Sequence, residues 1–344
     1  MSAFTSLDPA TDKKENSTQI VTTGLWDSGN GTLSTFFTAS ADSASVGKYY
    51  TNVYAAAATE SVQFSIAFGS YGNSGSVTGD LSKPAKSIYS QYGGSILTAG
   101  DSLFTVNGID AQHCVFLNVQ RARYKEKINR GNWQLTLSAS FKGAANGFLY
   151  LIDNSSISGS EVVGEGGKGY HIVSGSYSST TGLQTIHNSS APIYYGLFYP
   201  DIGMFVLDAT ALTSSVSSSV PVFGMTSTDP TSADGTAYTT YDINNEFFKA
   251  LKYGGSFIAR SEENVKNSIY FVRVKNRDYN YSTNPTYFDS AGNIKTEFIN
   301  DPKSYITSVG LYNDNDELIA IAKLSMPILK SQDRELLLKC KLDF

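Results

Sequence analysis

Cysteine, histidine and formal charge are all scarce in this 344-residue sequence, and each scarcity excludes a class of protein. It contains two cysteines and three histidines, too few of the usual ligands for a closed zinc site to be expected. Charged residues make up 17% of the chain, below the roughly 25% usual for soluble domains. The net charge of −5 does not suit a protein that binds nucleic acid by neutralising phosphates.

Long apolar runs and targeting signals are also lacking. No apolar run reaches about 18 residues, so no membrane-spanning helix is expected. Residues 1–9 lack the basic start and apolar stretch of a secretory signal, which predicts a protein made and kept in a cytoplasm. Because a cytoplasm is reducing, Cys114 and Cys340, which both lie in apolar strand-like runs, are predicted to be buried free thiols. A disulfide between them is the alternative.

Tyrosine, phenylalanine and glycine are abundant, at 22, 19 and 30 residues, and the charges are unevenly placed. No lysine or arginine lies between Lys168 and Lys249, where serine and threonine dominate. This pattern predicts four zones with soft boundaries. They are a polar amino-terminal arm (1–20), a β domain with a short helix (21–140), a Ser/Thr-rich, charge-poor β region (141–240) and a carboxy-terminal β domain (241–344).

Short strands are the dominant local pattern. Apolar residues alternate with polar ones, or form brief β-branched and aromatic runs between turn residues. Strands are predicted in this part of the chain at 63–68, 114–119, 133–138 and 147–152, with a hairpin joining 194–199 to 204–208.

The carboxy-terminal zone has the clearest strands, at 269–275, 305–312 and 318–322. The last strand alternates without a break, with Leu336, Leu338, Cys340, Leu342 and Phe344 predicted to face inward. The fold class is therefore mainly β, with antiparallel β-sandwich-like domains and two or three short helices.

Two segments have the capping residues and apolar spacing of helices. One begins at Ser82 and is predicted to stop at Gly93, and the other runs from Asn244 to Gly254. Residues 120–130 fit either a charged helix or an exposed strand.

Candidate catalytic and metal sites each have a simpler structural interpretation. His113, His171 and His187 are expected to be structural or solvent-exposed, and the acidic segment 313–317 is a hairpin turn rather than a calcium loop. The glycine-rich segment 164–169 lacks the spacing of a phosphate loop and is predicted to be a flexible loop. No nucleophile elbow is present, so we assign no catalytic, cofactor-binding or metal-binding residue and expect no enzyme and no cofactor.

Two segments could contact other molecules. Arg121, Arg123, Lys125, Lys127 and Arg130 would form one cationic face if the segment were a strand, either solvated or gripping an acidic neighbouring subunit. The polar aromatic loop 279–288 is a plausible contact surface, because tyrosine suits surfaces that are both apolar and wet.

Several stretches resemble virion structural proteins of contractile-tailed phages, in particular the T4-like phages of cyanobacteria. The resemblance lies mainly in Ser256–Ser261, Tyr270–Pro285 and Tyr305–Pro327, and more weakly in 86–92, 120–128 and 131–137. It implies a non-enzymatic building block of the virion, in the tail or baseplate, assembled in the host cytoplasm. The implied partners are other virion structural proteins and copies of itself, without nucleic acid and without a membrane span.

Two other functions remain open from the sequence. A host-receptor or glycan-binding module of the tail would expose tyrosines, for example at 279–287. An enzyme that degrades the cell envelope would need two carboxyl groups facing each other across a cleft.

Overall fold

The computed structural model describes residues 5–38, 49–56, 61–71, 82–138, 147–157, 159–216 and 240–343. Phe344 and residues 217–239, the end of the Ser/Thr-rich region, lie outside the described residues. The chain divides into two compact units. The larger unit is Val21–Glu263, and the smaller unit combines Met1–Ile20 with Asn264–Phe344. The soft boundaries predicted near 140 and 240 both fall inside the larger unit, and the segment 1–20 belongs to the smaller one.

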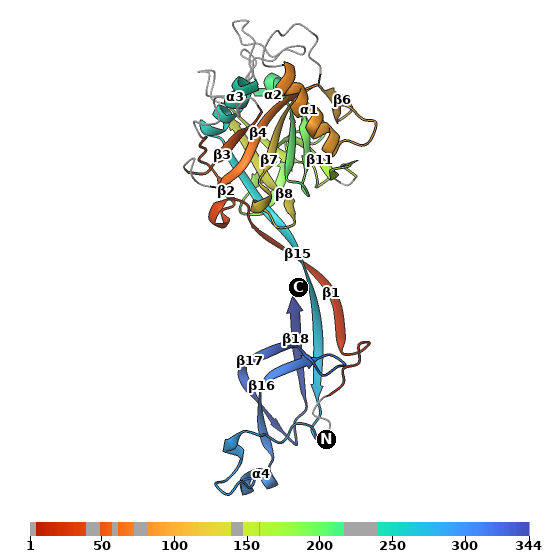
Figure 1. The fold of residues 1–344 in the computed structure, drawn as a ribbon, viewed down its shortest axis with the longest axis vertical. Coiled ribbons are helices and arrows are strands. Elements are labelled where there is room, and N and C mark those ends of the chain that lie inside the picture. Colours follow the sequence, from red (N-terminus) through yellow and green to blue (C-terminus); the bar gives the residue numbers. More distant parts are fainter. Residues whose placement is uncertain are drawn as a thin grey trace. The chain divides into compact units, whose positions relative to one another are not determined.

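The prediction of a mainly β, antiparallel fold with few helices is confirmed (Figure 1). In the larger unit the strands hydrogen-bond in the order β15-β8-β9-β11-β13-β14-β7-β4-β3. Their bounds are β3 (Thr51–Tyr54), β4 (Val62–Ser70), β7 (His113–Val119), β8 (Lys127–Ser138), β9 (Phe148–Asp153), β11 (Gly167–Ser178), β13 (Tyr194–Tyr199), β14 (Met204–Asp208) and β15 (Ser256–Val274). Short strands complete this unit: β2 (Thr32–Leu33), β5 (Phe104–Val106), β6 (Ile109–Ala111), β10 (Glu161–Gly164) and β12 (Leu183–Ile186).

One curled sheet supplies the walls around the main core. Leu33 of β2 pairs with Phe257 of β15, and four residues later Phe37 exchanges backbone hydrogen bonds with Tyr54 of β3. This segment therefore links the two ends of the strand order. The sequence predicted sandwich-like layers, and here the strands on either side of the core belong to one continuous sheet.

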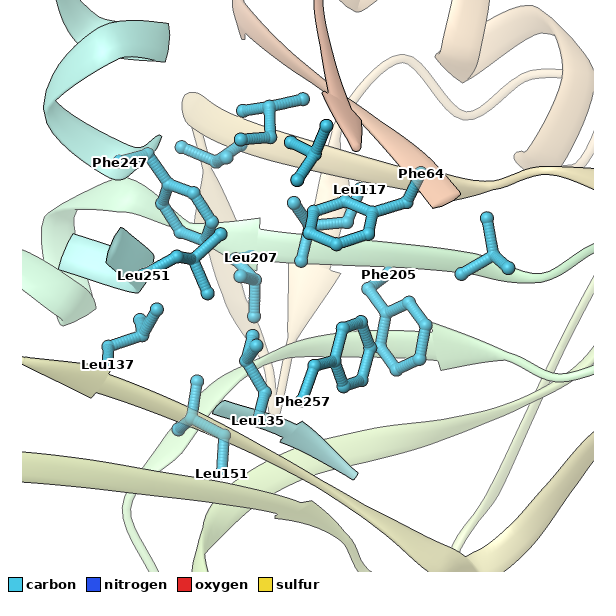
Figure 2. Packing of buried hydrophobic residues seen from close by; sticks show 14 of the residues in the cluster. Phe64, Leu117, Leu135, Leu137, Leu151, Phe205, Leu207, Phe247, Leu251 and Phe257 are labelled. Atoms are coloured by element: carbon cyan, nitrogen blue, oxygen red, sulfur yellow. The ribbon is translucent and has the colours of Figure 1, made fainter. Parts of the chain in front are cut away.

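Aromatic rings fill the inside of the curled sheet. Phe64, Phe205 and Phe257 lie close together on three different strands (Figure 2). The Phe257 ring centroid is 5.7 Å from that of Phe64 and 5.4 Å from that of Phe205, at steep interplanar angles in both pairs. Trp133 adds an edge contact to Phe205 at 4.8 Å. Such edge-to-face pairs are the geometry that aromatic quadrupoles favour. We call this group the inner cluster; it also contains Leu117, Leu135, Leu151, Leu207, Phe247 and Leu251.

A second group, the outer cluster, covers part of the opposite face of the same strands. In β7, Val115 and Leu117 face the inner cluster, whereas Cys114 and Phe116 face the outer one. Helix α1 (Ser82–Ile96) provides the cover, with Ile88, Tyr89 and Ile96 buried against the sheet. Strands buried on both faces read as continuous apolar runs, which is the pattern seen at 114–117.

The helices differ from the prediction in number and length. Gly93 does not stop α1, because the helix continues to Ile96, which is fully buried in the outer cluster and holds the last turn in place. Helix α3 (Thr240–Lys252) is confirmed, with Phe247 and Leu251 in the inner cluster. Two short helices, α2 (Ala209–Val216) and α4 (Thr296–Asn300), were not predicted.

The smaller unit is built from strands with little covering them. The second half of β15 pairs with β18 (Leu336–Asp343), so that Val272 lies opposite Leu338 and Tyr270 opposite Cys340. A separate two-stranded sheet joins β16 (Lys303–Tyr312) to β17 (Leu318–Ser331). The predicted alternation of β18 is confirmed, since Leu338 and Cys340 are buried while Lys339 and Lys341 are exposed.

The polarity of the amino-terminal arm predicted a solvated segment, but part of the arm is a paired strand. Residues Lys13–Gly24 form β1, which pairs with β15, and the amide of Phe271 donates to the Asp12 carbonyl oxygen at 2.7 Å. The physical reason is that the edge of β15 offers unpaired backbone groups, which bind an extended chain whatever its side chains are. Composition alone does not report this pairing.

Candidate interaction surface

The described residues contain no group of three or more histidine, cysteine, aspartate or glutamate side chains that could hold a metal ion. His113 is buried, stacks on Phe68 and lies 2.9 Å from the Ser70 hydroxyl through its Nδ1 atom. His171 lies edge-on to Tyr194, and burial lowers the pKa of its imidazole. His187 is exposed. Cys114 and Cys340 are buried free thiols, as predicted.

Two loops singled out in the sequence are hairpin turns. The glycine-rich segment forms a tight turn between β10 and β11, in which Gly164 pairs with Gly167, so the prediction of a flexible loop is wrong. The positive φ of +93° at Gly167 explains why glycine stands there. The acidic segment is the predicted turn between β16 and β17, where the Asn313 side-chain oxygen accepts from the amides of Asn315 and Glu317.

The basic stretch does not form a single cationic face. Arg121 and Arg123 lie in a 3₁₀ turn, and only from Lys127 is the chain a strand. Most of these cations have partners within the larger unit. Arg123 pairs with Asp27, Lys125 with Glu263 at 2.7 Å, and Lys127 with Glu262 at 3.3 Å. Arg130 donates to the Tyr170 hydroxyl and lies 3.6 Å from Glu161. Intramolecular pairing therefore accounts for the feature that suggested an acidic partner.

The hairpin β16–β17 carries exposed apolar residues in an unusual concentration. Ile319 and Ile321 share one face of β17 and are 66% and 60% exposed. Tyr305 and Tyr312 of β16 and Met326 of β17 are exposed as well. The alternate positions Ala320, Ala322 and Leu324 are half-buried on the other face. We call these exposed residues, with Leu318 of β17, the apolar hairpin surface.

The predicted contact loop at 279–288 is partly built into the smaller unit. Tyr287 is buried and stacks on Phe298 with centroids 4.4 Å apart, whereas Tyr279 and Tyr281 are 43% and 54% exposed. Both exposed tyrosines border a shallow cavity of about 300 Å³ with Val272, Val274 and Leu338 at its apolar floor. The structure thus places two of the predicted contact tyrosines on the surface and one in the interior.

A buried lysine holds this loop. Lys330 of β17 is fully buried, and its Nζ donates to the Asn276 carbonyl, the Asn280 side-chain oxygen and the Ser331 carbonyl at 2.7 to 2.8 Å. Burial lowers the pKa of this ammonium group. Three acceptors around one ammonium make a rigid attachment between β17 and residues 276–280. No local pattern of residues marks this lysine as interior.

Sequence reasoning identified the strand Leu318–Ala322 but missed that its isoleucines face outward. The only signal was the absence of polar residues on either face of the strand, since a free hairpin is normally polar on one side.

Comparison of the chain with protein families, curated proteins and solved structures finds no match. In the described part of the chain, no helix is both long and apolar enough to cross a bilayer.

Proposed function

We propose that this chain is a non-enzymatic structural subunit of a contractile-tailed phage particle, in the tail or baseplate, and that it works through protein–protein interfaces. The observation that carries the interface proposal is the apolar hairpin surface. The phage context comes from the sequence resemblance at 256–261, 270–285 and 305–327. The partners are copies of this chain and other virion proteins, and the site of action is the virion.

A two-stranded sheet with apolar residues on both faces supports such an interface. An isolated hairpin is marginally stable in water, and exposed apolar patches of this kind on soluble proteins mark sites of association. Ile319, Ile321 and Met326 together leave most of their side-chain surface in solvent. Burying apolar area is worth about 25 cal/mol per Å², so covering these side chains would stabilise an assembly substantially.

Self-association of the full chain tests the interface. We expect light scattering over about 1 to 100 μM to show concentration-dependent oligomers, and Ile319→Lys to weaken them by at least about tenfold, because a lysine on this surface would be desolvated. Leu183→Lys is the matched control, since Leu183 is an aliphatic residue of the larger unit with the same 66% exposure. A monomeric wild-type chain, or equal effects of the two variants, would count against the interface.

The phage context needs a separate measurement. Tailed particles that carry the gene should contain the chain in stoichiometric amounts by quantitative mass spectrometry, and cross-links should connect β16–β17 to another virion subunit. A chain found only in the soluble fraction of the infected cell would refute the virion role while leaving self-association intact.

A further inference from the structure

A polar groove lies on the outer face of β3, β4 and β7, beside helix α1. The helix rests on the sheet at Gly69, where an added Cβ would come within 3.0 Å of the Tyr89 backbone and of the Phe116 ring. Further along β4 the helix no longer covers the sheet. The uncovered part forms a cavity of about 520 Å³. All of its lining residues belong to the larger unit.

The floor of this groove is a single row of polar side chains across three strands. Asn52 of β3 pairs with Ser65 of β4, which pairs with Asn118 of β7. The Ser65 hydroxyl donates to the Asn52 side-chain oxygen at 2.7 Å. On the same face, two positions along, Ala67 and Phe116 are buried and apolar. The row therefore lies where the apolar surface beneath α1 ends, and asparagine is a residue that strands disfavour.

Aromatic rings and amides form the walls. Tyr92 of α1 is stacked on Phe116 with ring centroids 4.3 Å apart and an interplanar angle of 22°, which holds the ring in one orientation. Tyr49 and Tyr50, just before β3, also line the cavity and are 49% and 42% exposed. Gln91 of α1 and Gln120 at the end of β7 add two exposed amides.

The groove is longer than this one cavity. A second cavity of about 400 Å³ shares Ser65, Asn118 and Gln120 with the first and extends to Arg121 and Asp201. The Arg121 guanidinium already donates to the carbonyl oxygens of Tyr124 and Lys125 and lies over the Tyr124 ring. The Arg121 guanidinium therefore stabilises the turn through these hydrogen bonds, and we do not assign it a role in binding an anion.

The chemistry of the lining selects one class of ligand. None of the described side chains that line the first cavity carries a formal charge, which does not match a phosphate, a nucleotide or an acidic sugar. The row of hydroxyl and amide groups does not match a purely apolar ligand either. Amides both donate and accept, as sugar hydroxyl groups do, and tyrosine faces pack against the apolar face of a pyranose ring. We infer that this groove binds a neutral oligosaccharide, with Asn52, Ser65 and Asn118 contacting hydroxyl groups and Tyr50 and Tyr92 contacting the sugar rings.

This activity goes beyond the assembly role and lies in the other unit from the apolar hairpin surface. The proposed site is separate from the loop 279–287, which the sequence offered as an example of where a glycan-binding module would expose tyrosines. A subunit could thus hold its neighbours through one unit and a saccharide through the other.

The test uses the full chain with three neutral probes: cellohexaose, maltohexaose and the hexamer of N-acetylglucosamine. Saturation-transfer NMR should detect binding of at least one, and titration should give its affinity. Tyr50→Ala and Asn118→Ala should each weaken that binding by about tenfold or more, as loss of a central contact does. Both side chains are exposed, so the variants should fold normally.

Tyr253→Ala is the matched control, because Tyr253 is a tyrosine of the same unit outside the groove, 52% exposed against 42% for Tyr50. It should leave the affinity unchanged. Absence of transfer to all three probes, or binding that survives both groove variants, would overturn the inference. The self-association of Tyr50→Ala should equal that of the wild type, so failure here leaves the assembly proposal standing.

Discussion

The two units differ in how far they bury the same types of apolar residue. In the larger unit, β4, β7 and β14 carry buried apolar residues on both faces, in the inner and outer clusters. In the described part of the smaller unit, the only buried apolar side chains are those of Val274, Tyr287, Leu338 and Cys340. The larger unit is therefore stabilised from within, whereas the described part of the smaller one leaves much of its apolar surface exposed.

The difference follows from layering. A sheet is stable when its apolar face is covered by another layer, and the larger unit achieves this by curling and by adding α1 and α3. The hairpin β16–β17 pairs only with itself in the described structure. In the smaller unit, polar contacts such as the three hydrogen bonds of Lys330 help to hold the strands and loops together.

The largest expected effect comes from Leu338→Asp. Leu338 is 6% exposed, so this change places an unpaired charge in the small core of the smaller unit and should unfold that unit. Hydrogen exchange along β16 and β18 would report the loss. Both tryptophans, Trp26 and Trp133, lie in the larger unit, so their fluorescence should stay native.

Leu337→Asp is the control for this experiment, because Leu337 is the next residue of the same strand and is 61% exposed. It should leave exchange along β16 and β18 unchanged. Rapid exchange in both variants, or in neither, would contradict the assigned faces of β18.

A matched pair of aromatic truncations measures the contrast between units directly. Phe205→Ala should lower the free energy of unfolding of the larger unit by about 3–5 kcal/mol, because Phe205 is fully buried among aromatic rings. Tyr305→Ala in the smaller unit should cost about 0.5 kcal/mol or less, since Tyr305 is 66% exposed. Denaturant titrations followed by tryptophan fluorescence and by hydrogen exchange would give both values, and similar costs would remove the distinction.

Lys330→Met tests whether polar contacts replace a core in the smaller unit. Removing the ammonium leaves three acceptors without their donor, and we expect a loss of about 1–3 kcal/mol in that unit. Lys323→Met, an exposed position of the same strand, should be neutral. If Lys330→Met were as stable as the wild type, the hydrogen bonds of Lys330 would make no net contribution to the stability of the smaller unit.

Lys330 should also make the smaller unit sensitive to alkaline pH. Its folded pKa is lowered by burial, so between that pKa and the unfolded value the unfolded chain binds more protons. The stability of the smaller unit should therefore rise with pH across this window in the wild type. Hydrogen exchange or denaturant titration at several alkaline pH values should show this slope, which Lys330→Met should lack.

The smallest expected effect is in the reactivity of the two thiols. This experiment uses the wild-type chain. Burial raises the pKa of both Cys114 and Cys340, so neither should react with a thiol reagent at about pH 8 except through opening of the fold. Because the smaller unit has the thinner core, Cys340 should react before Cys114. Peptide mapping of the labelled chain would show the order, and the reverse order would contradict the ranking of the two units.

Local patterns predicted much of the secondary structure correctly. Alternation located β18, the run 114–119 located β7, and the residues Pro200–Gly203 located the hairpin between β13 and β14. Composition was misleading where pairing decided the structure. The polar segment from Lys13 is a strand because β15 offers it an edge, and Gly93 is helical because Ile96 is buried beyond it.

The candidate surfaces depended still more on tertiary structure. The basic stretch looked like one surface in the sequence, and the fold instead distributed Arg123, Lys125 and Lys127 among three acidic partners. The groove residues Asn52, Ser65 and Asn118 come from three strands, with Asn118 distant in sequence from the other two, and they meet through strand register. No local pattern could have grouped them.

The sequence by itself determined the class of fold and the location of most strands, because period and turn chemistry act over a few residues. Only the tertiary structure decided which apolar residues are core and which are surface. Ile66 of β4 and Ile321 of β17 both sit in strands, yet the first is fully buried and the second is 60% exposed. What separates them is whether another layer covers the strand, and that depends on chain segments distant in sequence.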